Sequence, residues 1–204
     1  VTGLKVGISN APSEQLILNN ISLRVESGSM HGLVGETGSG KSMTAKAVVG
    51  LLPRGLEAFD GSITFNGMEC LNIGEQEISR LRGRDIGMIF QNPRTALYPL
   101  TTVGTQISHI LKAHLDISST ECLSRINEIL GKVGITDTER VERSYPHELS
   151  GGMAQRVVIA AAIVCGPKLV IADEPTTGLD LTIQRQILEL ISDLQKSLGL
   201  SILM

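Results

Sequence analysis

Apolar and polar residues alternate in the first part of the chain, which predicts short strands. The stretches "LKVGIS" (4–9) and "NISLRVESG" (20–28) follow this pattern, as half-buried strands do. The stretch "GSITFNG" (61–67) predicts another strand, closed by the pair Asn66–Gly67, which favours a tight turn. The N-terminal part is therefore expected to be an antiparallel β region.

Continuous apolar runs further along the chain predict buried strands instead. These runs are "MHGLVG" (30–35), "RDIGMIFQ" (84–91), "KLVIAD" (168–173) and the final "LSILM". Strands that are buried on both faces, as in a parallel sheet, have this composition. The first run leads directly into glycines, and the third ends in an acidic residue.

Apolar residues that repeat every three or four positions predict helices between these strands. One helix is expected over 41–52, ended by Pro53. The stretch 153–166 is apolar on nearly all sides and predicts a buried helix, while a striped helix is expected over 183–198 before Gly199. Strands that alternate with helices predict an α/β fold with a largely parallel sheet.

The stretch between Pro93 and Pro146 is expected to be helical throughout. Ser118 and Glu121 have the spacing of a capping box. An apolar stripe and a terminal glycine follow this pair: Leu123, Ile126, Leu130, Val133 and Gly134. Most of this region is interpreted as helix packing alone.

Composition narrows the class of protein. The chain has 204 residues, of which 42% are hydrophobic and 2% aromatic, so one domain with an aliphatic core is expected, with room for an inserted subdomain. The net charge of −3 argues against nucleic-acid binding, which usually shows a basic surface. The three cysteines form no C-x-x-C pair, which argues against a metal site and a disulfide framework.

The ends of the sequence suggest a piece of a longer chain. No apolar run of about 18 residues predicts a membrane span, and the N-terminus lacks the pattern of a signal peptide. The sequence begins without Met and stops at Met204 within an apolar run. We therefore expect a fragment cut at both ends.

The segment "GETGSGKS" predicts a phosphate-binding loop between a strand and a helix. Glycines let the backbone wrap a polyphosphate, and the helix N-terminus adds a positive partial charge. Lys41 is expected to reach the β- and γ-phosphates, and the Ser42 hydroxyl to ligate Mg²⁺. The residues predicted to contact nucleotide here are Gly35, Glu36, Thr37, Gly38, Ser39, Gly40, Lys41, Ser42 and Thr44.

The acidic strand end supports this interpretation. Asp173 ends the apolar strand and is the candidate Mg²⁺ ligand, while Glu174 is the candidate base for an attacking water. Taken alone, the pair would equally well be an acidic turn before Pro175. The phosphate-binding loop makes the catalytic interpretation the stronger one.

A second anion-binding loop lies in "ELSGGMAQRV". Ser150 offers a hydroxyl, and Gly151 and Gly152 offer backbone amides at the start of a helix. One nucleotide has no obvious need of two such loops. Two chains would need them if each presented its second loop to the γ-phosphate bound by the other.

These motifs, in this order, resemble those of ATP-binding cassette (ABC) ATPases over almost the whole chain. The set comprises the P-loop "GETGSGKS", the Q-loop "FQNP", the signature "LSGGM", the Walker B strand "LVIADE" and the D-loop "TGLD". The resemblance implies one nucleotide-binding domain over 1–204, with a P-loop NTPase (RecA-like) core. Residues 1–92 and 151–204 would form an N-terminal antiparallel β subdomain and this core, and 93–150 an inserted helical subdomain.

The resemblance also implies roles and partners. Two chains would dimerise head to tail with two ATP molecules between them, and Gln91 would sense the γ-phosphate and Mg²⁺. "QNPRTALYPLTTVG" and "YPHELSGGMAQRVVIAAAI" resemble the ATPase subunits of bacterial peptide and nickel importers. Such subunits work as homo- or heterodimers on the cytoplasmic face of the inner membrane, beneath two permease subunits. An external solute-binding protein delivers the solute to these permease subunits. A coupling helix of the permease would contact the surface around the Q-loop.

Two departures from the family's pattern bear on activity. An aromatic residue usually stacks on adenine from an early strand, but Gly7 or Ile8 stands there and no aromatic precedes Phe59. We therefore expect weak discrimination between bases. The family's switch histidine would follow "LSILM", so none of His31, His109, His114 and His147 matches it, and these 204 residues are expected to bind nucleotide but hydrolyse it poorly.

Two other classes of protein are alternatives to the importer ATPase. A soluble ABC-type ATPase of DNA repair or translation usually carries a long coiled-coil insertion or a second cassette, and neither is visible in this sequence. A nucleotide-gated binding module would not need the candidate base Glu174. The transported solute is not expected to be encoded in this chain.

Overall fold

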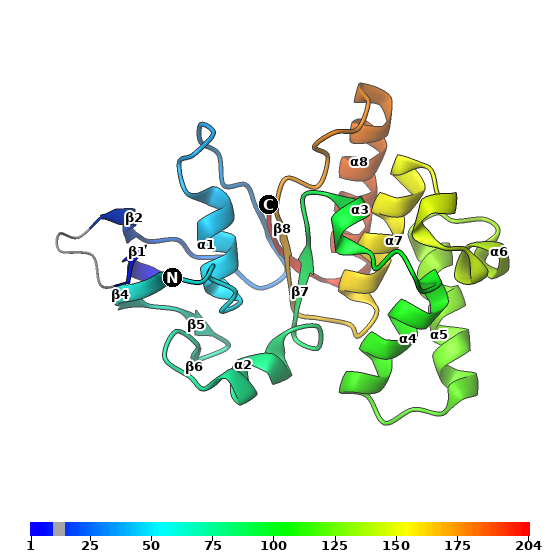
Figure 1. The fold of residues 1–204 in the computed structure, drawn as a ribbon, viewed down its shortest axis with the longest axis horizontal. Helices are drawn as coiled ribbons and strands as arrows, with labels where there is room; N and C mark the ends of the chain where they lie inside the picture. Colours follow the sequence, from blue (N-terminus) through cyan, green and yellow to red (C-terminus); the bar gives the residue numbers. More distant parts are fainter. Residues whose placement is uncertain (10–14) are drawn as a thin grey trace.

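The computed structural model describes residues 1–9 and 15–204 and shows an α/β fold with two separate larger sheets (Figure 1). The first sheet is antiparallel, with the strand order β2–β1–β4. Its strands are β1 (Thr2–Ile8), β2 (Leu16–Ile21) and β4 (Leu56–Ser62). A small hairpin follows, made of β5 (Thr64–Phe65) and β6 (Met68–Glu69), and the turn at Asn66–Gly67 has the predicted positive φ angles of 49° and 80°.

The second sheet is parallel throughout, with the strand order β3–β9–β8–β7. Its strands are β3 (Met30–His31), β7 (Ile86–Ile89), β8 (Leu169–Ala172) and β9 (Ser201–Leu203). The predicted α/β class with a mostly parallel sheet and an antiparallel N-terminal part is therefore correct.

Helices lie on both sides of the parallel sheet. In Figure 1, α1 (Lys41–Val48) lies between the antiparallel sheet and the strands β7 and β8, whereas α3, α7 and α8 lie beyond these strands. The helices after β7 are α3 (Pro93–Ala96), α4 (Val103–His114), α5 (Ser119–Lys132), α6 (Thr138–Arg143), the 3₁₀ turn η1 (Pro146–Glu148), α7 (Gly151–Ile163) and α8 (Leu181–Leu198).

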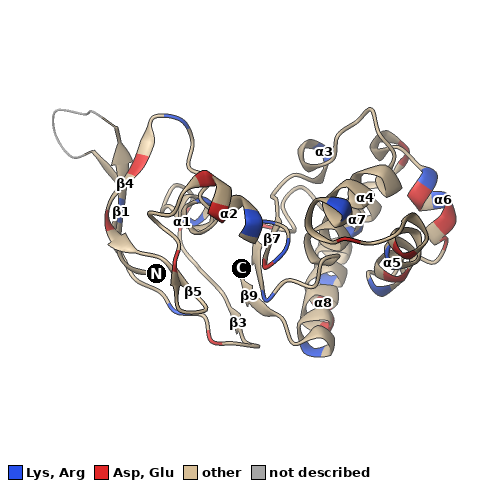
Figure 2. Ribbon diagram, turned by 90° about the horizontal axis from the view of Figure 1, so that it is seen from below, with Lys and Arg blue, Asp and Glu red and all other residues tan. Residues whose placement is uncertain are grey.

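Two aliphatic clusters hold the fold together. One joins the antiparallel sheet to α1 and includes Leu4, Val6 and Leu18, each at most 1% exposed. The other joins the helices of 93–150 to α7, α8 and the parallel sheet. Charged residues stay outside: acidic and basic segments intersperse along α5 and α6 in Figure 2, where Lys132 pairs with Glu128 and Arg140 with Asp137.

Several helix ends match the sequence prediction. Ser118 and Glu121 form the complete capping box of α5. Gly134 and Gly199 both adopt positive φ, of 79° and 65°, where α5 and α8 end. The predicted buried helix is α7, whose fully buried residues include Val157 and Ala160.

Other predicted boundaries were wrong. Strand β2 ends at Ile21, although residues 22–26 still alternate in exposure. The backbones of Leu23 and Val1 exchange two hydrogen bonds beyond this strand, and the amide of Gly3 donates to the hydroxyl of Ser22. Only Met30 and His31 of the expected strand 30–35 form a ladder with β9, and the amide of Leu33 adds one hydrogen bond to the carbonyl of Met204. The side chain of Val34 is 93% exposed.

Helix α1 ends at Val48 rather than at residue 52. Gly50 adopts a φ of 64°, which the helical conformation does not allow, and the carbonyl groups of Val49 and Gly50 accept hydrogen bonds from Arg82 instead. The short helix α2 (Glu75–Leu81) was not predicted, because only Ile78 of it is buried. Leu123 was predicted to belong to the buried stripe of α5, but it is 45% exposed. The neighbouring Cys122 is buried in its place.

Candidate functional site

The loop between β3 and α1 has the backbone of a phosphate cradle. Gly38 and Gly40 adopt φ angles of 84° and 93°, and Gly40 is the N-cap of α1. A side chain at Gly40 would collide with Leu18 of β2, so this position requires glycine for its space as well as its conformation. The loop residues 35–39 are exposed, and among their amides that of Ser39 donates a hydrogen bond of 3.1 Å to the carbonyl of Glu36.

The lysine of this loop lies over the cradle. Lys41 Nζ donates hydrogen bonds of 2.8 Å and 3.0 Å to the carbonyl groups of Gly35 and Glu36. Thr44 lies one helical turn inside α1, is 2% exposed, and donates from its hydroxyl to the carbonyl of Gly40 at 3.0 Å. Lys41 is therefore placed to exchange carbonyl partners for phosphate oxygens, whereas Thr44 braces the turn.

The loop meets the acidic strand end. Ser42 Oγ donates a hydrogen bond of 2.7 Å to Asp173 Oδ1. Asp173 is fixed in turn because its backbone amide donates to the carbonyl of Ile89 at the end of β7. A hydroxyl and a carboxylate oxygen are ligands that Mg²⁺ prefers, together with phosphate oxygens, so the residues present fit this ion.

Glu174 has the next position along the chain and is exposed. Its carboxylate oxygen Oε2 accepts hydrogen bonds from Gln91 Nε2 at 2.7 Å and from Thr177 Oγ1 at 3.1 Å. The structure thus brings Gln91 to the candidate base. It does not bring Gln91 into hydrogen-bond contact with Ser42 or Asp173.

The signature residues lie elsewhere. Ser150 is the N-cap of α7, and its hydroxyl accepts a hydrogen bond of 3.3 Å from the amide of Met153. Added side chains on Gly151 and Gly152 would approach Leu179 and Ile183, at 3.5 Å and 3.1 Å. The signature is therefore held against the start of α8.

Within one chain the two loops do not share a site. Helices α1 and α7 lie on opposite sides of β7 in both Figure 1 and Figure 2. In the part of the chain that the structure describes, no hydrogen bond joins residues 35–42 to residues 150–152.

The end of β1, where the nucleotide base would be expected to stack, is aliphatic. Ile8 ends β1 and is 41% exposed, and strand alternation places it on the same face as the buried Val6. Gly7 faces the other way, where a side chain would meet the ring of Phe59 at 2.9 Å. Phe59 therefore covers the outer face and does not replace the missing aromatic residue.

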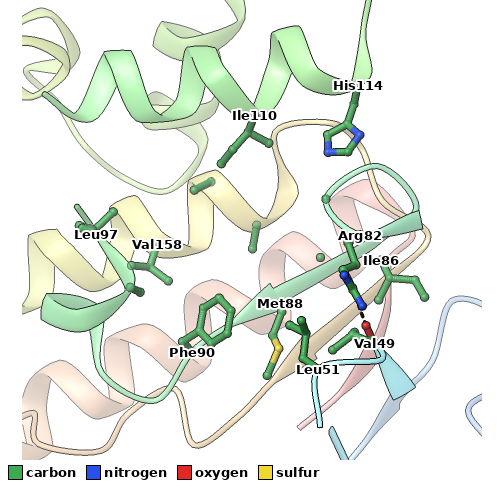
Figure 3. Close-up of a pocket in the computed structure, with 15 residues that line it drawn as sticks. Val49, Leu51, Arg82, Ile86, Met88, Phe90, Leu97, Ile110, His114 and Val158 are labelled. Carbon is green, nitrogen blue, oxygen red and sulfur yellow. Dashed lines mark hydrogen bonds between the residues drawn. The ribbon is translucent and has the colours of Figure 1, made fainter. Parts of the chain in front are cut away.

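An apolar groove of about 300 Å³ opens between β7 and the helices of 93–150. Phe90, which directly precedes Gln91, lies on its wall with Met88 and Leu51 (Figure 3). Ile110, Val158 and other aliphatic residues form the opposite wall. The groove thus connects the helical region with the segment that carries Gln91.

One contributor to the site was missed by sequence reasoning. Thr177 was named as part of the D-loop, but its hydrogen bond to Glu174 was not foreseen. The available signal was local, because Pro175 and Gly178 indicate a turn between the end of β8 and α8, in which Thr177 and Glu174 lie close together.

None of the helices in the described ranges is both long and apolar enough to cross a bilayer. No group of three or more His, Cys, Asp or Glu side chains is arranged as a metal site among residues 1–9 and 15–204.

Comparison with known proteins gives a consistent result. Residues 18–177 match the family model described as ABC transporter. The chain is 43% identical over 204 residues to the oligopeptide transport ATP-binding protein OppD of Escherichia coli (strain K12), and 44% identical over 204 residues to OppD of Bacillus subtilis (strain 168). Each alignment covers 100% of this chain but only 60% and 57% of the relative, so the chain spans little more than half of their length.

Solved structures show the same fold. The ATP-binding cassette MJ0796, solved as a dimer in a post-hydrolysis state with ADP and Pi, superimposes with a TM-score of 0.82 at 26% identity. The alignment covers 98% of this chain and 86% of that one.

Proposed function

Because the chain belongs to the ABC transporter family, we propose that it is the ATP-binding and ATP-hydrolysing part of an importer for peptides. The observation that carries the proposal is the meeting of the phosphate loop with the acidic strand end, where Ser42 donates to Asp173 at 2.7 Å. This contact gathers residues for phosphate, metal and water at one edge of the parallel sheet. The proposal treats 1–204 as one nucleotide-binding domain, in which 93–150 act as the helical subdomain beside 1–92 and 151–204.

Each residue of the site has a proposed task. The amides from Gly35 to Gly40 and the ammonium group of Lys41 bind the phosphates of ATP. Ser42, Asp173 and Gln91 would hold Mg²⁺, which when bound supplies charge to neutralise the phosphate oxygens. Glu174 orients the attacking water and accepts its proton.

The separation of the signature from the phosphate loop supports a dimer. Ser150, Gly151 and Gly152 present a hydroxyl and amides on the far side of β7 from their own phosphate loop. We propose that they contact the γ-phosphate of ATP bound to a second ABC subunit, identical or different. ATP then forms part of the interface, and hydrolysis weakens it.

The groove beside Gln91 supports a membrane partner. Its lining is mainly apolar, and Phe90 joins it directly to the residue that contacts Glu174. A helix of a permease subunit seated there would shift Phe90 and Gln91 together. The proposal therefore places the chain at the cytoplasmic face of the bacterial inner membrane, beneath two permease subunits fed by an external solute-binding protein.

Peptide is the proposed cargo because the relatives are described as oligopeptide transport proteins. None of the relatives compared above is described as a nickel transporter, so the nickel alternative has no support from them. The site itself contacts nucleotide, so the cargo would be selected by the partner subunits.

Replacement of Glu174 by Gln tests the enzymatic part of this proposal. The amide keeps the shape of the side chain but cannot accept the proton of water, so turnover should fall by about 100-fold or more. ATP-driven dimerisation of the full-length protein, followed by light scattering, should persist. A variant that hydrolyses ATP at the wild-type rate would exclude Glu174 as the base. A wild-type protein that dimerises with ATP but never hydrolyses it would identify a nucleotide-gated binding module.

A further inference from the structure

We propose that Thr177 is a positioning residue for Glu174, an inference that rests on the proposed function of Glu174 as the base. In this arrangement the Thr177 hydroxyl holds one carboxylate oxygen and leaves the other to face the attacking water. Three contacts of Thr177, Glu174 and Gln91 support this assignment.

The backbone at Glu174 is strained. Glu174 has a φ of 46°, in the left-handed region that residues with a side chain rarely adopt. Such strain persists only where the surrounding structure holds it, and it is concentrated at functional sites. Here the holding contact comes from the Thr177 amide, which donates a hydrogen bond of 3.1 Å to the Glu174 carbonyl.

The side chain of Thr177 closes the same turn. Its Oγ1 donates to Oε2 of Glu174 at 3.1 Å, so one residue fixes both the backbone and the carboxylate of the candidate base. Gln91 Nε2 donates to the same oxygen at 2.7 Å. Because both donors converge on Oε2, Oε1 is the oxygen left to accept a proton from water.

The two donors differ in their attachment. Gln91 follows β7 on a separate segment next to the apolar groove, and in the proposed function it turns to the γ-phosphate and Mg²⁺. Thr177 belongs to the turn that contains Glu174 and is joined to it by a backbone hydrogen bond. Once Gln91 leaves, Thr177 is the donor that keeps Oε2 in place during hydrolysis.

Substitutions at Thr177 in the full-length protein test this role through steady-state ATP turnover. Thr177→Val keeps the shape but loses the donor, and we expect kcat to fall by about 10-fold or more while KM changes little. Thr177→Ser keeps the hydroxyl and should restore most of the wild-type kcat. Thr176→Val, a change at the neighbouring half-buried threonine, is the matched control and should resemble wild type.

The outcomes distinguish a failure of the positioning role of Thr177 from a failure of the proposed ATPase function. The positioning role is refuted if Thr177→Val turns over like wild type, if Thr177→Ser is as slow as Thr177→Val, or if Thr177→Val loses ATP binding together with turnover. Absence of turnover in the wild-type protein itself would instead refute the proposed ATPase function. Thermal melting of each variant with and without ATP reports whether the fold and nucleotide binding remain.

Discussion

The amide of Met153 donates a hydrogen bond to the hydroxyl of Ser150, so the signature serine caps the helix that carries the signature glycines. The serine is exposed, and the helix that it caps lies on the other side of β7 from α1, which follows the phosphate loop (Figure 1). Ser150 thus caps α7 and is also the residue proposed to contact the partner's ATP, which links the stability of α7 to the proposed dimer. Experiments on Ser150 must therefore separate the loss of a helix cap from the loss of an interface.

Ser150→Arg should leave ATP binding by a single chain unchanged and block the ATP-driven dimer. The long cationic side chain would occupy the place of the partner's γ-phosphate, far from the chain's own nucleotide. Binding can be measured by fluorescence of a labelled ATP analogue, and dimerisation by analytical ultracentrifugation with ATP.

The matched control for this substitution is Ser118→Arg. Ser118 is also an exposed serine N-cap, of α5, and its loss costs a comparable ~1 kcal/mol of stability. This control should dimerise normally. If Ser150→Arg instead abolished ATP binding by the monomer, the signature would belong to the chain's own site.

Ser42→Ala should weaken ATP binding by about 10-fold when Mg²⁺ is present. The hydroxyl donates to Asp173 and is a proposed metal ligand, so its removal affects the metal and not the phosphate cradle. With excess EDTA the variant and the wild type should bind ATP equally, as measured by isothermal titration calorimetry. An equal loss of affinity in both conditions would contradict a metal-binding role.

Local chemistry explains how much of the site was predictable. The order of glycines, Lys41 and Ser42 predicts a phosphate loop, and Asp173 and Glu174 end an apolar strand, so short stretches were enough to propose both halves of the candidate site. The contacts of Ser42 with Asp173 and of Gln91 with Glu174 join residues far apart in the sequence. They depend on the order of strands in the parallel sheet, which the periodicity of single strands does not encode.

The same difference between local signals and contacts of distant residues explains which predictions about the fold were wrong. The alternation in residues 22–26 correctly predicts which side chains are exposed, but a strand also needs a neighbour to pair with. Helix α2 shows the opposite error. Its residues are mostly polar and exposed, and its Glu75 is held by Arg82, a contact that hydrophobic periodicity cannot reveal.

Ile8→Tyr should raise the affinities for ATP and GTP alike, by about tenfold, because every base offers a face for stacking. Ile8 is half-exposed at the end of β1 on the face of Val6, and an aromatic ring there could stack on a base at a gain of about 1–3 kcal/mol. The wild-type protein should bind ATP and GTP with similar affinity, measured by competition with a fluorescent nucleotide.

Ile17→Tyr is the matched control for this gain. Ile17 is equally exposed at 41%, but it lies on β2, at the register irregularity between the partners of Val6 and Gly7, and not at the end of β1. Its substitution should change neither affinity. Strong ATP selectivity of the wild-type protein would contradict the idea that the base is weakly recognised.

Glu75→Gln should lower thermal stability near neutral pH but not in acid. Arg82 lowers the pKa of Glu75 below its usual 4.5, first by its hydrogen bond and then by its charge. A lowered folded-state pKa stabilises the folded protein above the unfolded value, and this stabilisation is lost as the pH falls through the folded value. Because Glu75 is exposed, a drop in melting temperature of roughly 1–4 °C is expected at pH 7.

The difference between the variant and the wild type should therefore shrink below pH 4.5 and vanish at lower pH, where Glu75 is protonated in both states. Glu77→Gln is the control, since Glu77 lies in the first turn of the same helix and is exposed. Melting curves from pH 3 to pH 7 compare the three proteins. A constant difference across this range would show that Glu75 stabilises α2 without its charge, and an equal effect of Glu77→Gln would assign the loss to the charge of the helix terminus rather than to Arg82.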